Sequence, residues 1–273
     1  MLPKERVAAI FEHQPTDRVP IYMGSFSSRV ASEVLGRPNA CVGGGVNQFY
    51  ESCAWWEGED AHAAFEERCF QDAMDLPTAL DLDYVRPAYW RLPEKPTRQI
   101  DEFTSLYGDP DGAYRVMRFD PDTELYQIID QQPRRQTTVE DIERQVEAME
   151  RGLPDFQPTE AIAADWQRAM EVHGETRAVQ SGGVGVGIPR EPAWLEATAL
   201  RPDLVGRYLT LLGGINSATL HRGTTDDVVR ETMAALEVAH ECGSLMVGCS
   251  NLIVCQTPMA SFEAMMETLW ANR

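Results

Sequence analysis

Arg86 is the residue whose type and position point most directly to chemistry. It ends a strand-like run at residues 80–86, which Pro87 stops. A guanidinium at a strand end can hold a carboxylate through two parallel hydrogen bonds. A salt bridge to Asp83 or to a nearby acid is the more frequent role for such an arginine, and both roles stay open. The first role predicts a small-molecule site beside Arg86.

Three other side chains stand where predicted strands end. They are Tyr22, Ser181 and Asn251, each carrying a group that can exchange hydrogen bonds with a ligand. Active sites of parallel barrels gather at the carboxyl ends of their strands. We therefore predict a substrate-binding site formed by Tyr22, Arg86, Ser181 and Asn251.

The glycines that follow Ser181 superficially resemble a phosphate-binding loop. Residues 182–187 read Gly-Gly-Val-Gly-Val-Gly, with neither the lysine and threonine of a P-loop nor an acid at dinucleotide-binding spacing. The run therefore indicates a closely packed strand end, and we do not expect nucleotide binding.

Helical and strand-like segments alternate along the chain. Apolar spacing and breakers predict helices over 3–13, 60–74, 159–173, 226–242 and 261–270, and strands over 19–23, 80–86, 177–181 and 244–248. Residues 114–119 and 125–130 alternate around a turn at 120–123, which predicts a β-hairpin inserted outside the main sheet. A capping pattern at Thr138 opens a further polar helix. This order favours an α/β fold with a parallel sheet or barrel.

Several short motifs, in order, resemble the uroporphyrinogen decarboxylase (URO-D) superfamily. They include the opening run at residues 5–20, Gly-Gly-Ile-Asn at 213–216, Gly-Thr-Thr-Asp-Asp-Val at 223–228 and the strand with its exit loop at 244–251. The segment at 106–112 is similar to the corrinoid-linked methyltransferase-like branch. The resemblance implies a single TIM-barrel domain over residues 1–273, with an N-terminal helical elaboration.

The chain is shorter than this resemblance requires. A complete (β/α)8 barrel takes about 250 residues before any elaboration, and the motifs of the third and seventh strands lie close together here. The resemblance therefore implies an incomplete barrel that lacks strands 4 to 6, with a deletion junction near residues 203–208.

Zinc is the cofactor that the methyltransferase-like branch implies. There, a His-x-Cys motif and a cysteine near the eighth strand hold the metal, which activates a substrate thiol. This chain has no His-x-Cys, and Asn251 stands at the remaining ligand position, with Cys249 and Cys255 beside it. Cys249 and Cys255 are candidate zinc ligands that need further partners, and two reduced structural thiols are the ordinary alternative.

The resemblance leaves two functions open. Porphyrin decarboxylases hold several substrate carboxylates with arginines, whereas the corresponding segment here, 22–29, offers only Arg29, a surface residue more often than a ligand. We expect instead the methyltransferase or demethylase type, which moves a methyl group from a small substrate with a corrinoid protein as partner. The alternative is a truncated, inactive barrel that acts as a binding or interaction protein.

Composition narrows the possible partners and location. The formal net charge of -19, from 24 Lys plus Arg against 43 Asp plus Glu, repels phosphate backbones and anionic lipid, so we expect neither nucleic acid nor membrane as partner. Six scattered cysteines and the lack of a long apolar run favour reduced thiols and a cytoplasmic location. The open edges of an incomplete barrel predict a homo-oligomer.

Overall fold

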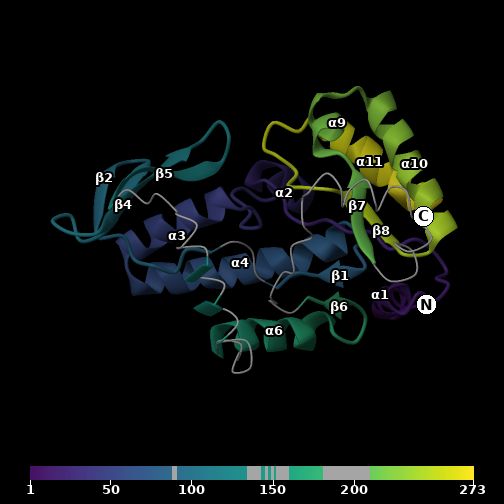
Figure 1. The fold of residues 1–273 in the computed structure, drawn as a ribbon, viewed down its shortest axis with the longest axis horizontal. Coiled ribbons are helices and arrows are strands. Elements are labelled where there is room, and N and C mark those ends of the chain that lie inside the picture. The colour runs from purple at the N-terminus through teal and green to yellow at the C-terminus, as the bar shows by residue number, and fades with distance from the viewer. Residues whose placement is uncertain (88–90, 134–142, 145–146, 149–150, 152–159, 181–209) are drawn as a thin grey trace.

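The chain folds as a mixed α/β protein (Figure 1). The computed structural model describes residues 1–87, 91–133, 143–144, 147–148, 151, 160–180 and 210–273. The predicted deletion junction at 203–208 and the start of the predicted helix at Thr138 lie outside these residues. No helix in the described ranges is both long and apolar enough to cross a membrane.

Two pairs of parallel strands make up the centre of the fold. β7 (Leu211–Ile215) pairs with β8 (Leu245–Cys249) over five residues, and β1 (Tyr84–Val85) pairs with β6 (Ala178–Val179) over two. Within the described residues these strands form no closed ring. The α/β class is therefore as the sequence predicts.

An extended segment at residues 19–26 lies between the two pairs. It bridges β8 and its exit loop in parallel, through Ile21 to Val247 and Phe26 to Ile253. On its other side, the Tyr22 and Tyr84 rings stack with centroids 5.3 Å apart. The spatial order is therefore β7, β8, residues 19–26, β1 and β6.

Three predicted strands are shorter in the structure than the sequence suggests, and the run at 177–181 keeps only Ala178–Val179 as strand within the described residues. The run at 19–23 makes one isolated bridge, and the run at 80–86 keeps only Tyr84–Val85 as strand. The second run is shortened because α4 (Glu59–Ala79) continues through Pro77 instead of stopping before it. A proline in the last turn costs few helical hydrogen bonds, and the chain turns only at Asp81, where φ is 48°.

An antiparallel sheet of four strands lies apart from the parallel ones (Figure 1). Its strands run in sequence order: β2 (Arg98–Asp101), β3 (Thr104–Gly108), β4 (Tyr114–Asp120) and β5 (Leu125–Gln132). The predicted hairpin is β4 with β5, but it belongs to this larger sheet. The sheet packs on α3 (Gly45–Glu57), where the Phe49 and Phe119 rings stack 4.2 Å apart.

The remaining helices follow the predicted periodicity closely. The five predicted helices correspond to α1 (Pro3–Phe11), α4, α6 (Glu160–His173), α10 (Thr225–Cys242) and α11 (Met259–Asn272). The structure adds α2 (Ser28–Leu35), α3 and the short α9 (Ser217–Arg222). Ser27 caps α2 by accepting a hydrogen bond from Val30, and Gly36 ends it in the left-handed conformation.

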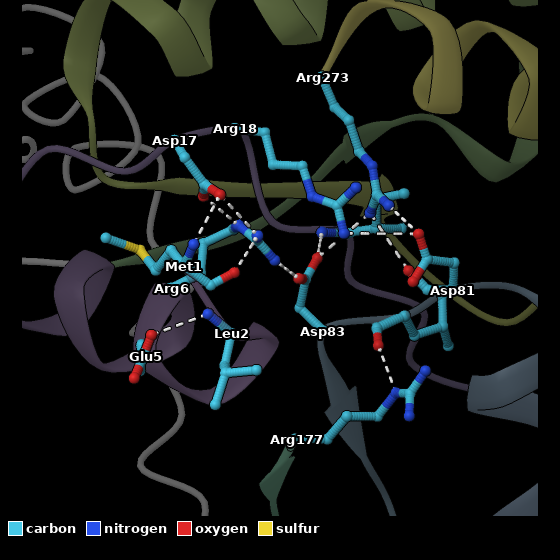
Figure 2. Close-up of polar contacts among 12 residues, drawn as sticks. Met1, Leu2, Glu5, Arg6, Asp17, Arg18, Asp81, Asp83, Arg177 and Arg273 are labelled. Carbon is cyan, nitrogen blue, oxygen red and sulfur yellow. Dashed lines mark hydrogen bonds and ion pairs between the residues drawn. The ribbon is translucent and has the colours of Figure 1, made fainter.

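Buried charges close the amino ends of the parallel strands (Figure 2). Asp83 precedes β1, is fully buried, and accepts hydrogen bonds from Arg6 of α1, from the Ile21 amide at 2.8 Å and from Arg273 at 3.4 Å. Arg6 also contacts Asp17 at 2.7 and 3.1 Å. This network joins α1, residues 17–21, the start of β1 and the end of α11 at one end of the strands.

Candidate functional site

A pocket of about 400 Å³ opens at the opposite, carboxyl ends of the same strands. It is lined by the ends of three neighbouring segments, by the start of α3 with the residue before it, and by the start of β5. The lining residues are Tyr22, Gly24, Ser25, Gly44, Gly45, Arg86, Leu125, Cys249, Ser250, Asn251 and Leu252. Its volume falls in the range of pockets that hold small molecules. Three predicted substrate residues, Tyr22, Arg86 and Asn251, meet here, whereas Ser181 lies outside the described residues.

Arg86 is oriented by the neighbouring segment. Its Nη1 donates a hydrogen bond to the Gly24 carbonyl oxygen at 2.7 Å. The Tyr84 hydroxyl donates to the Met23 carbonyl oxygen, so two consecutive carbonyls of the segment are bonded to side chains from β1 and its exit. The guanidinium is therefore held at the pocket wall by the backbone that also carries Tyr22.

Ser25 and Asn251 add a hydroxyl and a carboxamide to the pocket wall. The Ser25 Oγ is shielded from solvent and has no hydrogen-bond partner within the described part of the chain. The Asn251 Oδ1 accepts a hydrogen bond from the Leu252 amide at 2.8 Å, which orients its carboxamide. A ligand oxygen in the pocket would supply the partner that Ser25 lacks, since buried polar groups are normally hydrogen-bonded.

The hairpin between β4 and β5 forms another wall. Glu124 accepts hydrogen bonds from the Ser28 amide at 2.8 Å and the Arg29 amide at 3.0 Å, at the positive end of the α2 dipole. A Cβ on Gly45 would lie 2.5 Å from the Tyr126 nitrogen, so only glycine permits the hairpin to approach α3 this closely. This approach brings Leu125 to the pocket.

The exit loop of β8 is anchored to the same hairpin. The Cys255 thiol donates a hydrogen bond to the Asp122 carbonyl oxygen at 3.0 Å, and Gln256 donates to the same oxygen. Arg29, which the sequence suggests is solvated, donates to the Cys255 and Thr257 carbonyls and to Glu33 at 3.1 Å. Arg29 thus holds the loop in place, and it does not line the pocket.

The charge of the pocket wall, as far as its residues are described, is opposite in sign to that of the whole protein. Arg86 is the sole charged side chain among the residues described as lining it, although the whole chain carries a formal charge of -19. A positive group on a partly enclosed apolar wall attracts an anion more strongly than it would in open solvent. The arrangement suits a small molecule that carries a carboxylate.

The two candidate zinc ligands do not assemble a metal site in the described structure. Cys249 lines the pocket, but burial raises the pKa of its thiol, and burial likewise raises the pKa of Cys255. Cysteine binds zinc as the thiolate, and the metal takes about four ligands in all. In the described ranges, neither cysteine belongs to a group of three potential ligands, so the residues do not fit zinc.

Within the described ranges, one group of three potential metal ligands lies away from the pocket, and an arginine side chain binds to it. Glu51, His62 and Glu66 lie close together, and Arg91 donates to both oxygens of Glu51 at 2.8 and 2.6 Å. Burial by itself would raise the pKa of Glu51, but hydrogen bonds from Arg91 and His62 hold it below its usual value. Arg91 also donates to Glu66 of α4 at 2.9 Å, so it links α3 to α4, and its guanidinium occupies the place of a cation.

Some pocket residues carried no sequence signal. Ser25 is not among them, because residues 22–25 follow a predicted strand end and are candidates by position. Gly44, Gly45 and Leu125 come from a loop and a hairpin that are distant in sequence from the strand ends, and only packing brings them to the pocket.

Comparisons with protein-family models, with curated proteins and with solved structures found no match.

Proposed function

We propose that the pocket binds a small carboxylate-bearing substrate, and that the chain is an incomplete barrel of the URO-D superfamily. The observation that carries the binding proposal is Arg86, the one charged side chain among the described residues that line a pocket at the carboxyl ends of neighbouring parallel strands. The family proposal rests on the sequence motifs. The strand order around residues 19–26 is consistent with it, because the first and last strands of a barrel are neighbours.

The ligand chemistry follows from the groups on the pocket wall. A carboxylate accepts hydrogen bonds from a guanidinium and from hydroxyls, and Arg86, Ser25 and Tyr22 carry such donors. Apolar contact with Leu125 and Leu252 suits a short hydrocarbon portion of the ligand. One arginine matches one carboxylate, which favours a small acid over a porphyrinogen with several.

Within that superfamily, the methyltransferase-like type is the activity we favour. It takes a small methylated substrate and works with a corrinoid protein, whereas porphyrin decarboxylation requires more arginines than the described pocket has. Because the described residues do not fit zinc, we assign to this chain the binding and orientation of the substrate.

A second candidate is a binding protein without catalysis. It is favoured by the two thiols Cys249 and Cys255, whose pKa values burial raises, away from the thiolate that metal binding or methyl acceptance requires. Both candidates use the same pocket, and they differ only in turnover.

Ligand-observed NMR tests the binding proposal. Saturation-transfer spectra would be recorded for short mono- and dicarboxylic acids and for their neutral amides, with the purified full chain. We expect signals from acids and none from the matched amides at equal concentration. Equal signals from acids and amides, or none from either, would overturn the assignment of the pocket to carboxylates.

A spectroscopic assay separates the two candidates. Methylcobalamin serves as the corrinoid probe and a small thiol as the methyl acceptor, and loss of the methyl–cobalt absorbance is followed with and without the protein. Protein-dependent loss supports the methyltransferase-like type. The absence of any protein-dependent change, with carboxylate binding intact, supports the binding protein.

A further inference from the structure

Cys41 and Cys69 lie in one buried cluster away from the pocket, and the exposed Arg68 contacts Cys41. Cys41 lies in the loop between α2 and α3, and Cys69 lies in α4; both side chains belong to one buried cluster with Ala54 and Phe65. Cys41 has no exposed surface, and Cys69 has little. Neither cysteine forms a disulfide in this structure.

Three neighbours distinguish the sulfur of Cys41. The Arg68 Nε donates a hydrogen bond to it at 3.2 Å, and Cys69 shares its buried cluster. In its protonated form Cys41 reaches the Asn39 carbonyl oxygen at 3.4 Å. Arg68 is itself exposed, so the side chain that contacts the Cys41 sulfur also contacts solvent.

The backbone of Cys41 is fixed on both sides. Its amide donates to Asp72 of α4 at 2.6 Å, and its carbonyl oxygen accepts from Asn47 of α3 at 3.0 Å. Asp72 is in turn bonded to Arg37 at 2.7 Å. These anchors fix the backbone of Cys41, whose side chain belongs to the same buried cluster as that of Cys69.

We propose that Cys41 and Cys69 form a redox-active dithiol, in which a peroxide oxidises Cys41 and Cys69 then closes an intramolecular disulfide. The geometry gives each cysteine a separate role: Cys41 next to the arginine is the nucleophile, and Cys69 is the resolving thiol. The oxidant belongs to the class of hydroperoxides, of which hydrogen peroxide is the simplest.

The electrostatics of the two thiols agree with these roles. The hydrogen bond from Cys69 lowers the pKa of Cys41, burial opposes this, and the charge of Arg68 lowers it further. The same hydrogen bond and burial raise the pKa of Cys69. Burial raises the pKa of Cys53, Cys249 and Cys255 as well, so these are poorer nucleophiles.

The proposed oxidation balances in two steps. Cys41 first releases its thiol proton, and its thiolate attacks one oxygen of hydrogen peroxide. A sulfur–oxygen bond forms as the oxygen–oxygen bond breaks, and the departing hydroxide combines with the released proton to give water and a Cys41 sulfenic acid. The Cys69 sulfur then attacks the Cys41 sulfur, the sulfur–oxygen bond breaks, and the departing oxygen leaves as water with the Cys69 proton. Two thiols lose two electrons and two protons, and one peroxide becomes two waters.

Mass spectrometry of the full chain tests this proposal. The protein is treated with hydrogen peroxide, its remaining thiols are alkylated, and the digest is searched for disulfide-linked peptides. We expect a Cys41–Cys69 crosslink that dithiothreitol removes. In Cys69→Ser, dimedone should label Cys41 as a sulfenic acid, and Cys41→Ser should give neither product.

Two further variants test whether crosslinking depends on Arg68 and not on another cysteine. Arg68→Gln changes an exposed side chain and should slow crosslinking several-fold at neutral pH, whereas Cys53→Ser should leave the rate unchanged. The proposal is overturned if no Cys41–Cys69 peptide forms, or if Cys53, Cys249 or Cys255 is oxidised faster. The crosslinking experiment does not depend on carboxylate binding. If the carboxylate-binding proposal fails, the dithiol proposal is therefore unaffected.

Discussion

Charged residues divide between the two ends of the parallel strands, as Asp83 and Arg86 illustrate. The two lie on either side of β1, and Asp83 is 0% exposed within the network that Arg6 and Arg273 complete (Figure 2). Arg86 lies at the pocket. Ligands of parallel α/β sheets bind at the carboxyl ends of the strands, and we propose that Asp83 serves stability and Arg86 serves ligand binding.

Asp83 and Asp17 contact the same arginine, Arg6, but differ in burial. Asp83→Asn removes one charge of a buried pair, and we expect a loss of about 3 to 5 kcal/mol in the free energy of unfolding. Asp17 is 44% exposed, so Asp17→Asn should cost about 1 kcal/mol or less. Urea denaturation followed by circular dichroism measures both. Equal losses of unfolding free energy in the two variants would contradict the prediction that the buried acid contributes more.

The pH dependence of stability should also reflect Asp17. Hydrogen bonding from Arg6 holds the pKa of Asp17 well below its usual value, although desolvation opposes it. A carboxyl whose pKa is depressed by folding stabilises the protein above its unfolded pKa, about 3.9, and loses this contribution as the pH falls below it.

We therefore expect the stability difference between the native chain and Asp17→Asn to be present at pH 6 and to shrink below about pH 4. Urea midpoints recorded from pH 6 to pH 3 measure it. A difference that grows on acidification would contradict the assignment of Asp17 to Arg6.

Among the elements, the contact of β8 with residues 19–26 is the most constrained by its sequence. A Cβ on Gly248 would lie 1.5 Å from the Tyr22 carbonyl oxygen, which is backbone and cannot turn aside. The absence of a side chain at Gly248 is therefore what permits the extended segment to approach β8 and to bring Tyr22 to the pocket.

Substitution of this glycine tests the contact. Gly248→Ala should destabilise the protein by more than about 3 kcal/mol, since backbone clashes exceed ordinary overpacking of side chains. The matched control is Gly24→Ala, whose Cβ would first meet the tip of the Tyr22 side chain at 3.0 Å and should cost about 1 kcal/mol or less. Thermal unfolding of both variants gives the comparison, and a tolerated Gly248→Ala would refute the close approach.

Helices were more predictable than strands, for reasons that particular segments illustrate. The pattern at 226–242 predicts α10 to within one residue, because helical hydrogen bonds and the Thr224 cap are local. The run at 80–86 has strand character, yet its strand length depends on the partner at 178–179, which no local pattern reveals. The strands at 98–101 and 104–108 were missed for the same reason.

The candidate site was predictable in part for related reasons. Strand ends are local features, and they pointed to Tyr22, Arg86 and Asn251. The wall made by Gly45 and Leu125 depends on the packing of the antiparallel sheet against α3, which involves residues far apart in the sequence.

The whole molecule presents apolar side chains on an outer strand of its antiparallel sheet. β5 ends the strand order in the described structure, and Leu125, Ile128 and Ile129 on it are exposed. Exposed strand edges and apolar residues favour association with another chain. We propose a homo-oligomer, on grounds separate from the open barrel edges that suggest one from the sequence.

Light scattering with metal analysis on the same sample tests this proposal. We expect an oligomer that contains less than one equivalent of zinc per chain. A stable monomer that unfolds cooperatively would contradict the proposed association. Tight stoichiometric zinc, lost on Cys249→Ser or Cys255→Ser, would contradict our conclusion that these residues do not fit the metal.

Calorimetric titration of the pocket tests the role of Arg86 most directly. The best carboxylate from the NMR screen is titrated into the native chain, into Arg86→Gln and into Arg118→Gln, which alters an exposed arginine on β4. We predict that Arg86→Gln weakens binding by about tenfold or more, equivalent to about 1.4 kcal/mol, and that Arg118→Gln leaves the affinity unchanged. Unchanged affinity in Arg86→Gln would contradict the assignment of this pocket as a carboxylate site.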